Sequence, residues 1–323
     1  MKYGVNKSGR STGQILSGNK IILPMILSNY HRPVLLPDVM ELLNIKKDRQ
    51  YVDATLGGGG YSLAIVNRGG KVLGLDIDPE AIDFARQKAR QERIGQEKWQ
   101  IWQESFTDIR LIAGNNGFSR VWGIIFDLGV SSHQLDFSGR GFSFRKGDEK
   151  LDMRFSGKNP LTAEEVINQY SKVRLYEIFT KYAEELSAGT IAGAVVRARS
   201  LKKRISSVAD LNRIIIEAVP GEEREQQKVL ARIYQALRIE VNSELSTIEE
   251  GLREASGLLT NGGRILVLSY HSLEDRLVKG FFREKARSGE FKILTKSPIR
   301  AEYEEIRHNP RARSAKLRAA EKI

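Results

Sequence analysis

The stretch YVDATLGGGGYS, residues 51–62, combines the residue types that could most directly support chemistry. An apolar, β-prone run meets an acid at Asp53, and four consecutive glycines follow at Gly57 to Gly60. A glycine run lets a ligand approach the backbone closely, or it forms a tight turn between a strand and a helix. A phosphate, a nucleoside and a tight turn are therefore the three candidate explanations.

Two phosphate-binding motifs do not fit this loop. A P-loop requires Lys and then Ser or Thr after its glycines, whereas Tyr61 and Ser62 follow Gly60. The dinucleotide fingerprint requires a third glycine, and that position falls on Ser62 or Leu63. The remaining interpretation is a site for S-adenosylmethionine (SAM), in which an acid ends the first strand and glycines follow. The acid and two of the glycines match that pattern: Asp53, Gly57 and Gly59.

Acids also end two later apolar segments. In GLDID, Asp76 is placed to accept the hydroxyl groups of a ribose, and in IIFDLGVSSHQLD, Asp127 opens a polar loop that includes Gln134. Ligands of α/β sheets lie across the carboxyl ends of the strands, so we expect both acids at one site. The alternatives are a strand–helix turn for the glycine loop and a helix cap for Asp127.

Strand and helix patterns alternate in the half of the chain that carries these residues. The helix pattern after the second strand opens with Pro79, which is favoured at the first helical position. Such alternation is typical of a parallel sheet covered on both faces. The expected strands are 50–56, 71–78, 99–105 and 121–130, and the expected helices are 59–70 and 79–92.

From about Leu161 to Ala255 the periodicity is helical, and near Asn261 the strand pattern returns. Segment 261–270 predicts a buried strand, 272–286 a helix, and 291–296 with 314–323 a closing hairpin. For the helix we expect Ser272 as N-cap and Asp275 at the capping-box position. The pattern therefore predicts an α/β fold, one sheet domain with an inserted all-helical domain; with the SAM interpretation of the glycine loop, the expected fold class is a Rossmann-like class I SAM-dependent methyltransferase sheet. The expected division is a methyltransferase domain, 30–145 and 241–323, with the insertion at 146–240.

The composition is that of a basic globular protein. Lys and Arg exceed Asp and Glu by 52 to 40, which gives a net charge of +12 and favours a polyanionic partner such as nucleic acid. The chain has no Cys, which suits a cytoplasmic protein and excludes disulfides and thiolate metal sites. Residues 1–29 carry basic residues and no acid, so we expect a flexible basic extension.

Eight long and unusual motifs occur in an order that resembles one protein family. They are HRPVLL, DATLGGGGYS, DLGVSSHQLD, RGFSF, LDMR, YQALRIEVNSEL, GGRILVLSYHSLEDRLVK and NPRARSAKLRAAEK. Together they closely resemble the bacterial 16S ribosomal RNA cytosine-N4 methyltransferases, the MraW family. The resemblance extends from about His31 to Ile323.

The resemblance implies a SAM-dependent enzyme whose inserted helical domain helps to recognise the substrate. It also implies methylation of the exocyclic N4 amine of a cytidine in the decoding centre of 16S rRNA. Two positions depart from the usual pattern, Tyr61 in place of His and His133 in place of Pro. The family's cofactor contacts fall on Gly59, Gly60, Tyr61, Asp76, Phe106, Asp127 and Gln134.

Methylation of this amine needs acceptors that hold its hydrogens and direct its lone pair toward the methyl group. We expect Asp127, or a main-chain carbonyl just after it, to orient the amine, because the common Pro-Pro platform is replaced by DLGV. Ser269 and His271 in SYHSLEDR are candidates for holding the base. Alternatively, His271 satisfies the local backbone and Glu274 caps a helix. The four His are far apart in sequence and lack ligand spacing, so we expect no metal.

Basic residues are expected to carry the affinity for RNA, as cations for phosphates and aromatics for stacking on bases. The alternatives are core packing for the aromatics and a solvated face for the cations. The stretch RARSLKKR, residues 197–204, is a further phosphate candidate. The predicted RNA-binding residues are Arg140, Phe142, Arg145, Lys146, Arg154, Arg311 and Arg313.

Three functional hypotheses follow from these patterns. The favoured one is an RNA base methyltransferase that acts on 16S rRNA within the small ribosomal subunit, as a monomer or a dimer. The second is a non-enzymatic ribosome-binding protein that kept a methyltransferase-like shell. The third is a small-molecule methyltransferase, for which the basic excess has no obvious use. The intact acids and glycines of the SAM pattern argue against a shell without activity.

Overall fold

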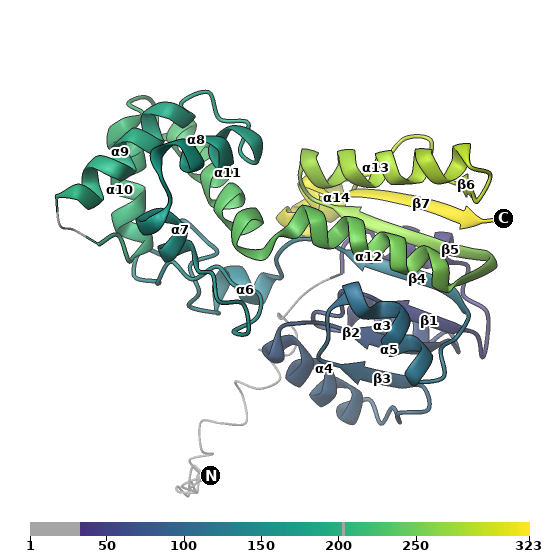
Figure 1. The fold of residues 1–323 in the computed structure, drawn as a ribbon. Coiled ribbons are helices and arrows are strands. Elements are labelled where there is room, and N and C mark those ends of the chain that lie inside the picture. Colours follow the sequence, from purple (N-terminus) through teal and green to yellow (C-terminus); the bar gives the residue numbers. More distant parts are fainter. Residues whose placement is uncertain (1–32, 202–203) are drawn as a thin grey trace, which may run out of the picture.

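The architecture is that of a computed structural model, which describes residues 33–201 and 204–323 (Figure 1). The predicted N-terminal extension, residues 1–29, lies outside the described residues, as do Lys202 and Lys203 of the basic stretch 197–204. Within the described ranges, no helix is both long enough and apolar enough to cross a membrane.

In the described part of the chain, a seven-stranded sheet has the order β3-β2-β1-β4-β5-β7-β6. Strands β1 to β5 run parallel, and β7 runs antiparallel to both of its neighbours. This doubly wound order confirms the predicted Rossmann-like α/β fold, and the β6–β7 pairing confirms the predicted closing pair of strands. The strands are β1 (Gln50–Asp53), β2 (Lys71–Leu75), β3 (Trp99–Trp102), β4 (Val121–Asp127), β5 (Leu259–Ser269), β6 (Phe291–Ile293) and β7 (Lys316–Lys322).

Neighbouring residues of the central strands point to opposite faces of the sheet, as strand geometry requires. In β4, Ile124 and Phe126 belong to one hydrophobic cluster, whereas Ile125 between them belongs to another. In β5, Val267 belongs to the first of these clusters and Leu268 to the second. The uninterrupted apolar runs of these strands therefore reflect burial on both faces.

Helices cover the two faces of the sheet. One face packs against α2 (Leu36–Leu43), α3 (Gly60–Val66) and α4 (Pro79–Gln91). The other packs against α5 (Ile109–Asn115), α12 (Glu244–Leu258) and α13 (Ser272–Arg287). Shorter elements complete the loops: η1 (Phe106–Asp108), α6 (Ser132–Asp136), α14 (Tyr303–His308) and η2 (Pro310–Ser314).

A second group of helices gathers on one side of the sheet (Figure 1). These helices share a hydrophobic cluster of their own, whose members run from Phe142 to Val241. In the described residues between Leu161 and Ala255, Ser207 alone takes part in a β-bridge, to Lys150. The division at residues 146 and 240 stays a prediction. The helices are α7 (Ala163–Gln169), α8 (Lys172–Lys181), α9 (Ala188–Ser200), α10 (Val208–Ala218) and α11 (Glu223–Asn242).

Helix α11 continues into α12 after a sharp turn at Ser243, so one chain segment joins the helical group to the sheet (Figure 1). Ser243 has a φ of 49°, which is left-handed. Arg238 on α11 spans this turn and pairs with Glu244 through two hydrogen bonds of 2.7 and 2.9 Å. Both side chains are largely buried, and the pair fixes the angle between the two helices.

The expected cap of α13 is wrong by one residue. His271, and not Ser272, is the N-cap, because His271 still has extended backbone angles of −133° and 169°. Its capping-box partner is Glu274. Asp275 instead forms an ion pair with Arg318 on β7, with 2.7 Å between Oδ1 and Nε.

Candidate active site

The carboxyl ends of the parallel strands border a cavity of about 550 Å³ that reaches α11 and α12. This volume lies within the range of roughly 300–1,000 Å³ that is usual for small-molecule sites. Ligands of doubly wound sheets bind at this edge. Seven of the predicted cofactor residues line the cavity: Gly57, Gly60, Tyr61, Asp76, Phe106, Asp127 and Gln134.

Asp76 follows β2 and holds the loop after β1 in place. Its Oδ2 accepts the N–H of Gly57 at 2.8 Å, and its Oδ1 accepts the N–H of Asp78 at 2.9 Å. Burial raises the pKa of Asp76 to about 6, although these two N–H groups stabilise the charged form. The carboxylate is therefore mostly ionised at neutral pH and retains the acceptor capacity that ribose hydroxyls require.

Asp127 ends β4 at the same edge of the sheet. Its main-chain N–H donates to Thr55 Oγ1 at 2.6 Å, and its Oδ1 accepts the hydroxyl of Tyr270 at 2.6 Å. Thr55 and Tyr270 also line the cavity. The two bonds hold a carboxylate in the cavity wall, where it can attract a cation or accept a hydrogen bond from an amine.

Tyr61 lies at the start of α3, and its hydroxyl donates to the main-chain carbonyl of Val34 at 2.7 Å. Burial, together with the nearby charge of Asp127, holds the pKa of Tyr61 well above its usual value. The phenol is therefore protonated and acts as a donor. Because the hydroxyl holds the segment before α2, the ring is the part of Tyr61 that is available to a ligand.

Asp53 and Gly59 are not among the residues that line the cavity, so this geometry does not support direct cofactor contact by either. Asp53 is fully buried, and its Oδ2 accepts the hydroxyl of Ser62 at 2.7 Å. Gly59 has a φ of +66°, and a Cβ there would lie 2.6 Å from the ring of Trp99. The left-handed turn and the closeness of Trp99 explain why a glycine stands at position 59. This agrees with the alternative interpretation of the glycine loop as a strand–helix turn.

Gln134 joins the loop after β4 to the end of β2. It belongs to a capping box with Ser131 at the start of α6. Its Nε2 donates to Asp78 Oδ2 at 2.7 Å, and the same oxygen accepts from Arg140 Nη2 at 2.6 Å. His133, the departure from Pro, is tied to α4 by a distance of 2.6 Å between its Nε2 and Glu80 Oε2. These contacts fix the wall of the cavity that Asp127 begins.

Phe106 supplies an apolar wall. Its ring meets Phe126 edge-on, with 5.4 Å between ring centroids. A Cβ at Gly251 on α12 would lie 2.4 Å from the ring, so the backbone of α12 packs directly against it. Ile77 and Leu128 also line the cavity. An aromatic and aliphatic wall of this kind suits a flat base such as adenine.

These residues fit SAM. The Phe106 wall suits the adenine, Asp76 the ribose hydroxyls, and Asp127 the positive charge of the sulfonium. Gly57 and Gly60 bring main chain to the cavity without side chains. Neither a row of N–H donors nor a Lys is needed, because SAM carries no phosphate.

Comparison with known proteins identifies the family. The model of the MraW methylase family matches residues 28–323. The chain belongs to the MraW methylase family. Membership confirms the predicted resemblance, and with it the predicted methylase activity and its cofactor, SAM.

Curated relatives match this MraW methylase over almost their whole length. "Ribosomal RNA small subunit methyltransferase H" of Carboxydothermus hydrogenoformans is 44% identical over 91% of this chain and 98% of its own. The protein of that name from Flavobacterium psychrophilum is 42% identical over 89% of this chain and 100% of its own. An rRNA methylase structure from Streptococcus thermophilus is 12% identical, with a TM-score of 0.42 over 89% of this chain and 93% of that one.

Ser269 and His271, the two candidates for holding the base, differ in their relation to the cavity of this MraW methylase. Ser269 is 1% exposed and does not line the cavity; its Oγ donates to the carbonyl of Lys316 on β7 at 3.4 Å. His271 lines the cavity, but its Nδ1 accepts the N–H of Glu274 at 3.4 Å and its Nε2 is buried. The alternative for His271, a role in the local backbone and helix cap, fits the geometry.

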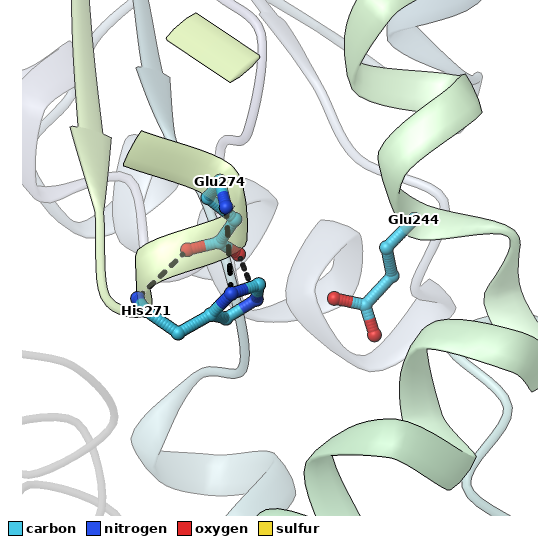
Figure 2. Close-up of side chains that lie close together, drawn as sticks. All are labelled: Glu244, His271 and Glu274. Atoms are coloured by element: carbon cyan, nitrogen blue, oxygen red, sulfur yellow. Dashed lines mark hydrogen bonds and ion pairs between the residues drawn. The ribbon is translucent and has the colours of Figure 1, made fainter. Parts of the chain in front are cut away.

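Glu244, His271 and Glu274 form a cluster in which one ligand atom of each lies within 4.8 Å of the others (Figure 2). The two oxygens of Glu244 are already paired with Arg238. Because Nδ1 of His271 accepts a hydrogen bond, its proton lies on Nε2, which faces Glu274 Oε1 at 3.1 Å. A metal would have to displace that proton beside a guanidinium group, so we assign none to this cluster.

Three predicted RNA-binding residues make contacts within the protein, and one of them, Phe142, also lines the cavity. Arg140 pairs with buried Asp78 and also donates to the carbonyls of Arg154 and Phe155. Arg154 is held by Asp152 through bonds of 2.9 and 2.8 Å. Phe142 is 6% exposed and stacks on Phe155, with 5.5 Å between ring centroids. These side chains hold the loop before α7 together, and their contact with RNA stays a prediction.

The remaining predicted RNA-binding residues lie at the surface or the cavity. Arg145 and Lys146 are exposed, and Arg145 also borders the cavity beside the ring of Phe144. Arg313 is exposed on η2. Arg311 lines the cavity and pairs with Asp136, with 2.6 Å between Nη2 and Oδ2. These residues stay candidates for contact with RNA.

Sequence reasoning missed Tyr270 and Asp78. Tyr270 stands one residue before His271, and the pattern drew attention to the His as the more familiar catalytic type. An aromatic donor directly after a buried strand was the available signal. Asp78 stands two residues after Asp76 in GLDID, and its carboxylate binds Gln134 and Arg140.

Proposed function

We propose that the protein transfers a methyl group from SAM to the exocyclic N4 amine of a cytidine in the decoding centre of 16S rRNA. Support for rRNA as substrate comes from the small-subunit rRNA methyltransferases that are 44% and 42% identical. The observation that carries the choice of an amine is Asp127, a carboxylate fixed in the wall of the SAM cavity by Thr55 and Tyr270.

The amine of cytosine is a poor nucleophile because its lone pair is conjugated with the ring. An acceptor that holds one of its hydrogens turns the lone pair out of that conjugation and toward the methyl group. SAM supplies an electrophilic methyl group: the new nitrogen–carbon bond forms as the carbon–sulfur bond breaks, its electron pair stays on sulfur, and one amine proton leaves to water.

In this proposal Asp127 accepts one hydrogen of the amine, and the main chain of the following loop is placed to accept the other. The loop is anchored at both ends, because the N–H of Leu128 donates to the carbonyl of Leu268 at 3.1 Å and Gln134 binds Asp78. The small subunit in the cytoplasm is the proposed setting of the reaction.

The substitution Asp127→Asn tests the role of this carboxylate. We expect turnover to fall by about a hundredfold or more, since a neutral amide presents one acceptor oxygen and one N–H₂ donor to the amine. We expect a smaller loss of SAM affinity than of turnover, because only the charge that faces the sulfonium is removed and Asp76, Phe106 and the glycine loop remain. The measurement is methyl transfer from labelled SAM to small subunits, with SAM affinity by calorimetry; near-normal turnover would contradict the proposal.

A further inference from the structure

We infer that Tyr270 is a positioning residue for methyl transfer, and that its hydroxyl sets the orientation of the Asp127 carboxylate toward the target amine. The inference rests on the proposed function, because it concerns the same carboxylate. It adds a residue from the turn between β5 and α13 to a site otherwise built mainly from the loops after β1, β2, β3 and β4.

The first support is the contact itself. The hydroxyl of Tyr270 donates to Asp127 Oδ1 at 2.6 Å, and both residues line the cavity. The ring also lies 3.5 Å from where a Cβ of Gly129 would be, so it packs against the loop that Asp127 begins. Tyr270 therefore touches both the carboxylate and the main chain proposed to receive the amine.

The phenol acts only as a donor in this contact. Burial, followed by the charge of Asp127, raises the pKa of Tyr270 well above its usual value. A carboxylate has about four acceptor positions on its two oxygens. A bond from Tyr270 therefore fixes the plane of the carboxylate without exhausting its capacity, and a second donor such as an amine can still bind.

The position of Tyr270 is itself held from behind. Its main-chain N–H donates to Glu274 Oε2 at 2.7 Å, and the N–H of His271 donates to the same oxygen at 3.3 Å. Glu274 is fully buried. Burial opposes its charge, but the contacts with His271 and the charge of Arg238 lower the pKa of Glu274. An ionised, buried Glu274 thus anchors the start of α13.

This anchoring explains the cluster of Figure 2. Glu274 faces His271 and lies near the Arg238–Glu244 pair, which belongs to the junction of α11 and α12. Glu274 of this cluster accepts the main-chain N–H of Tyr270, and the hydroxyl of Tyr270 donates to Asp127. The chain of contacts joins the helical group to the carboxylate, and Tyr270 makes its last link to Asp127.

The test is Tyr270→Phe, which removes the hydroxyl and keeps the ring. Loss of a hydrogen bond to a charged group predicts a fall in kcat of about ten- to a hundredfold, with SAM affinity and KM for small subunits within about threefold. The matched control is Tyr51→Phe. Tyr51 is a fully buried Tyr with one hydrogen bond to its hydroxyl, from the N–H of Lys46 at 2.7 Å, and it does not line the cavity. Its kcat should equal that of the unaltered protein.

The double variant Tyr270→Phe, Asp127→Asn separates positioning from general stability. If Tyr270 acts through Asp127, the double variant loses no more kcat than Asp127→Asn alone. Multiplied losses, or a Tyr270→Phe variant that matches Tyr51→Phe, would overturn the inference. If Tyr270→Phe does not fold, 3-fluorotyrosine at position 270 keeps the shape and alters only the donated bond. A changed kcat at constant SAM affinity then supports the inference, and an unchanged kcat overturns it.

The same assay on the unaltered protein distinguishes a failure of the proposed function from a failure of the inference about Tyr270. Absence of methyl transfer to rRNA in the unaltered protein would remove the proposed function and this inference together. Normal transfer in the unaltered protein with normal transfer in Tyr270→Phe removes the inference alone.

Discussion

At the scale of single residues, the carboxylates around the cavity have distinct tasks. Asp76 accepts two main-chain N–H groups, Asp127 accepts a phenol, and Asp53 is enclosed behind the glycine loop with one oxygen bound to Ser62. The other oxygen of Asp53 has no hydrogen-bond partner among the described residues. This difference in environment predicts a difference in how protonation affects the protein.

Asp53→Asn should flatten part of the pH dependence of stability. Burial raises the Asp53 pKa from 3.8 to about 7, so the folded state retains a proton that the unfolded state has released. The resulting stability is fully present below about pH 4 and is lost as the pH rises through about 7, an effect of at most roughly 4 kcal/mol. Urea unfolding of both proteins without ligand at pH 5 to 8 measures it. Parallel pH profiles would contradict this assignment.

Sequence reasoning at the residue scale found groups that follow a motif and missed groups that depend on orientation. Asp76 and Asp127 could be placed because the end of a parallel strand fixes where a residue lies. The role of Arg140 could not be predicted, because its partner Asp78 is 62 positions away in the sequence and is brought close only by folding. Ser269 was misplaced for a related reason: its hydroxyl binds the carbonyl of Lys316 on the paired strand β7, a contact that depends on the fold.

At the scale of elements, the glycine loop is a strand–helix turn whose glycines have separate duties. Gly57 brings its N–H to Asp76, Gly60 borders the cavity, and Gly59 turns the chain with left-handed backbone angles. The sequence could show that the loop must approach something closely. It could not show that for Gly59 the close neighbour is Trp99 on β3, since that contact depends on how α3 and α4 pack.

Gly59→Ala should destabilise the protein. The substitution places a Cβ at a positive φ and 2.6 Å from the ring of Trp99, which predicts a loss of about 2 kcal/mol or more. The control is Gly280→Ala in α13, where a Cβ meets no atom within 4 Å and the helix should gain up to about 1 kcal/mol. Thermal and urea unfolding measure both changes. An unchanged stability for Gly59→Ala would show that the turn tolerates a side chain.

At the scale of the whole molecule, the basic residues divide into those that stabilise loops and those that face solvent. The net charge of +12 was predictive of a polyanionic partner, but it could not distinguish exposed cations from internal ones. Arg140 and Arg154 stabilise loops, whereas Arg145, Lys146 and Arg313 face solvent. The helical periodicity of the sequence predicted the inserted helices. It could not predict the ion pair between Arg238 and Glu244 at the bend into α12.

Removal of exposed cations should weaken RNA binding in a salt-dependent manner. For Arg145→Ala and Lys146→Ala we expect lower affinity for 16S rRNA and a log–log salt slope that is smaller by about 1 for each lost phosphate contact. Arg253→Ala is the control, since Arg253 is exposed on α12 beside Glu249 and does not line the cavity. Filter binding across a salt series provides the slopes. Equal slopes for all three variants would place the RNA elsewhere.

The central claim is that the cavity at the ends of β1, β2 and β4 delivers a methyl group from SAM to cytosine N4. The most direct measurement incubates the protein with methyl-labelled SAM and either free 16S rRNA, assembled small subunits or no RNA, and identifies the labelled nucleoside by mass spectrometry. The account predicts label in N4-methylcytidine from one decoding-centre position, and none without RNA. Label at a carbon atom of the base or at a ribose hydroxyl, or SAM binding without transfer to any RNA, would contradict it.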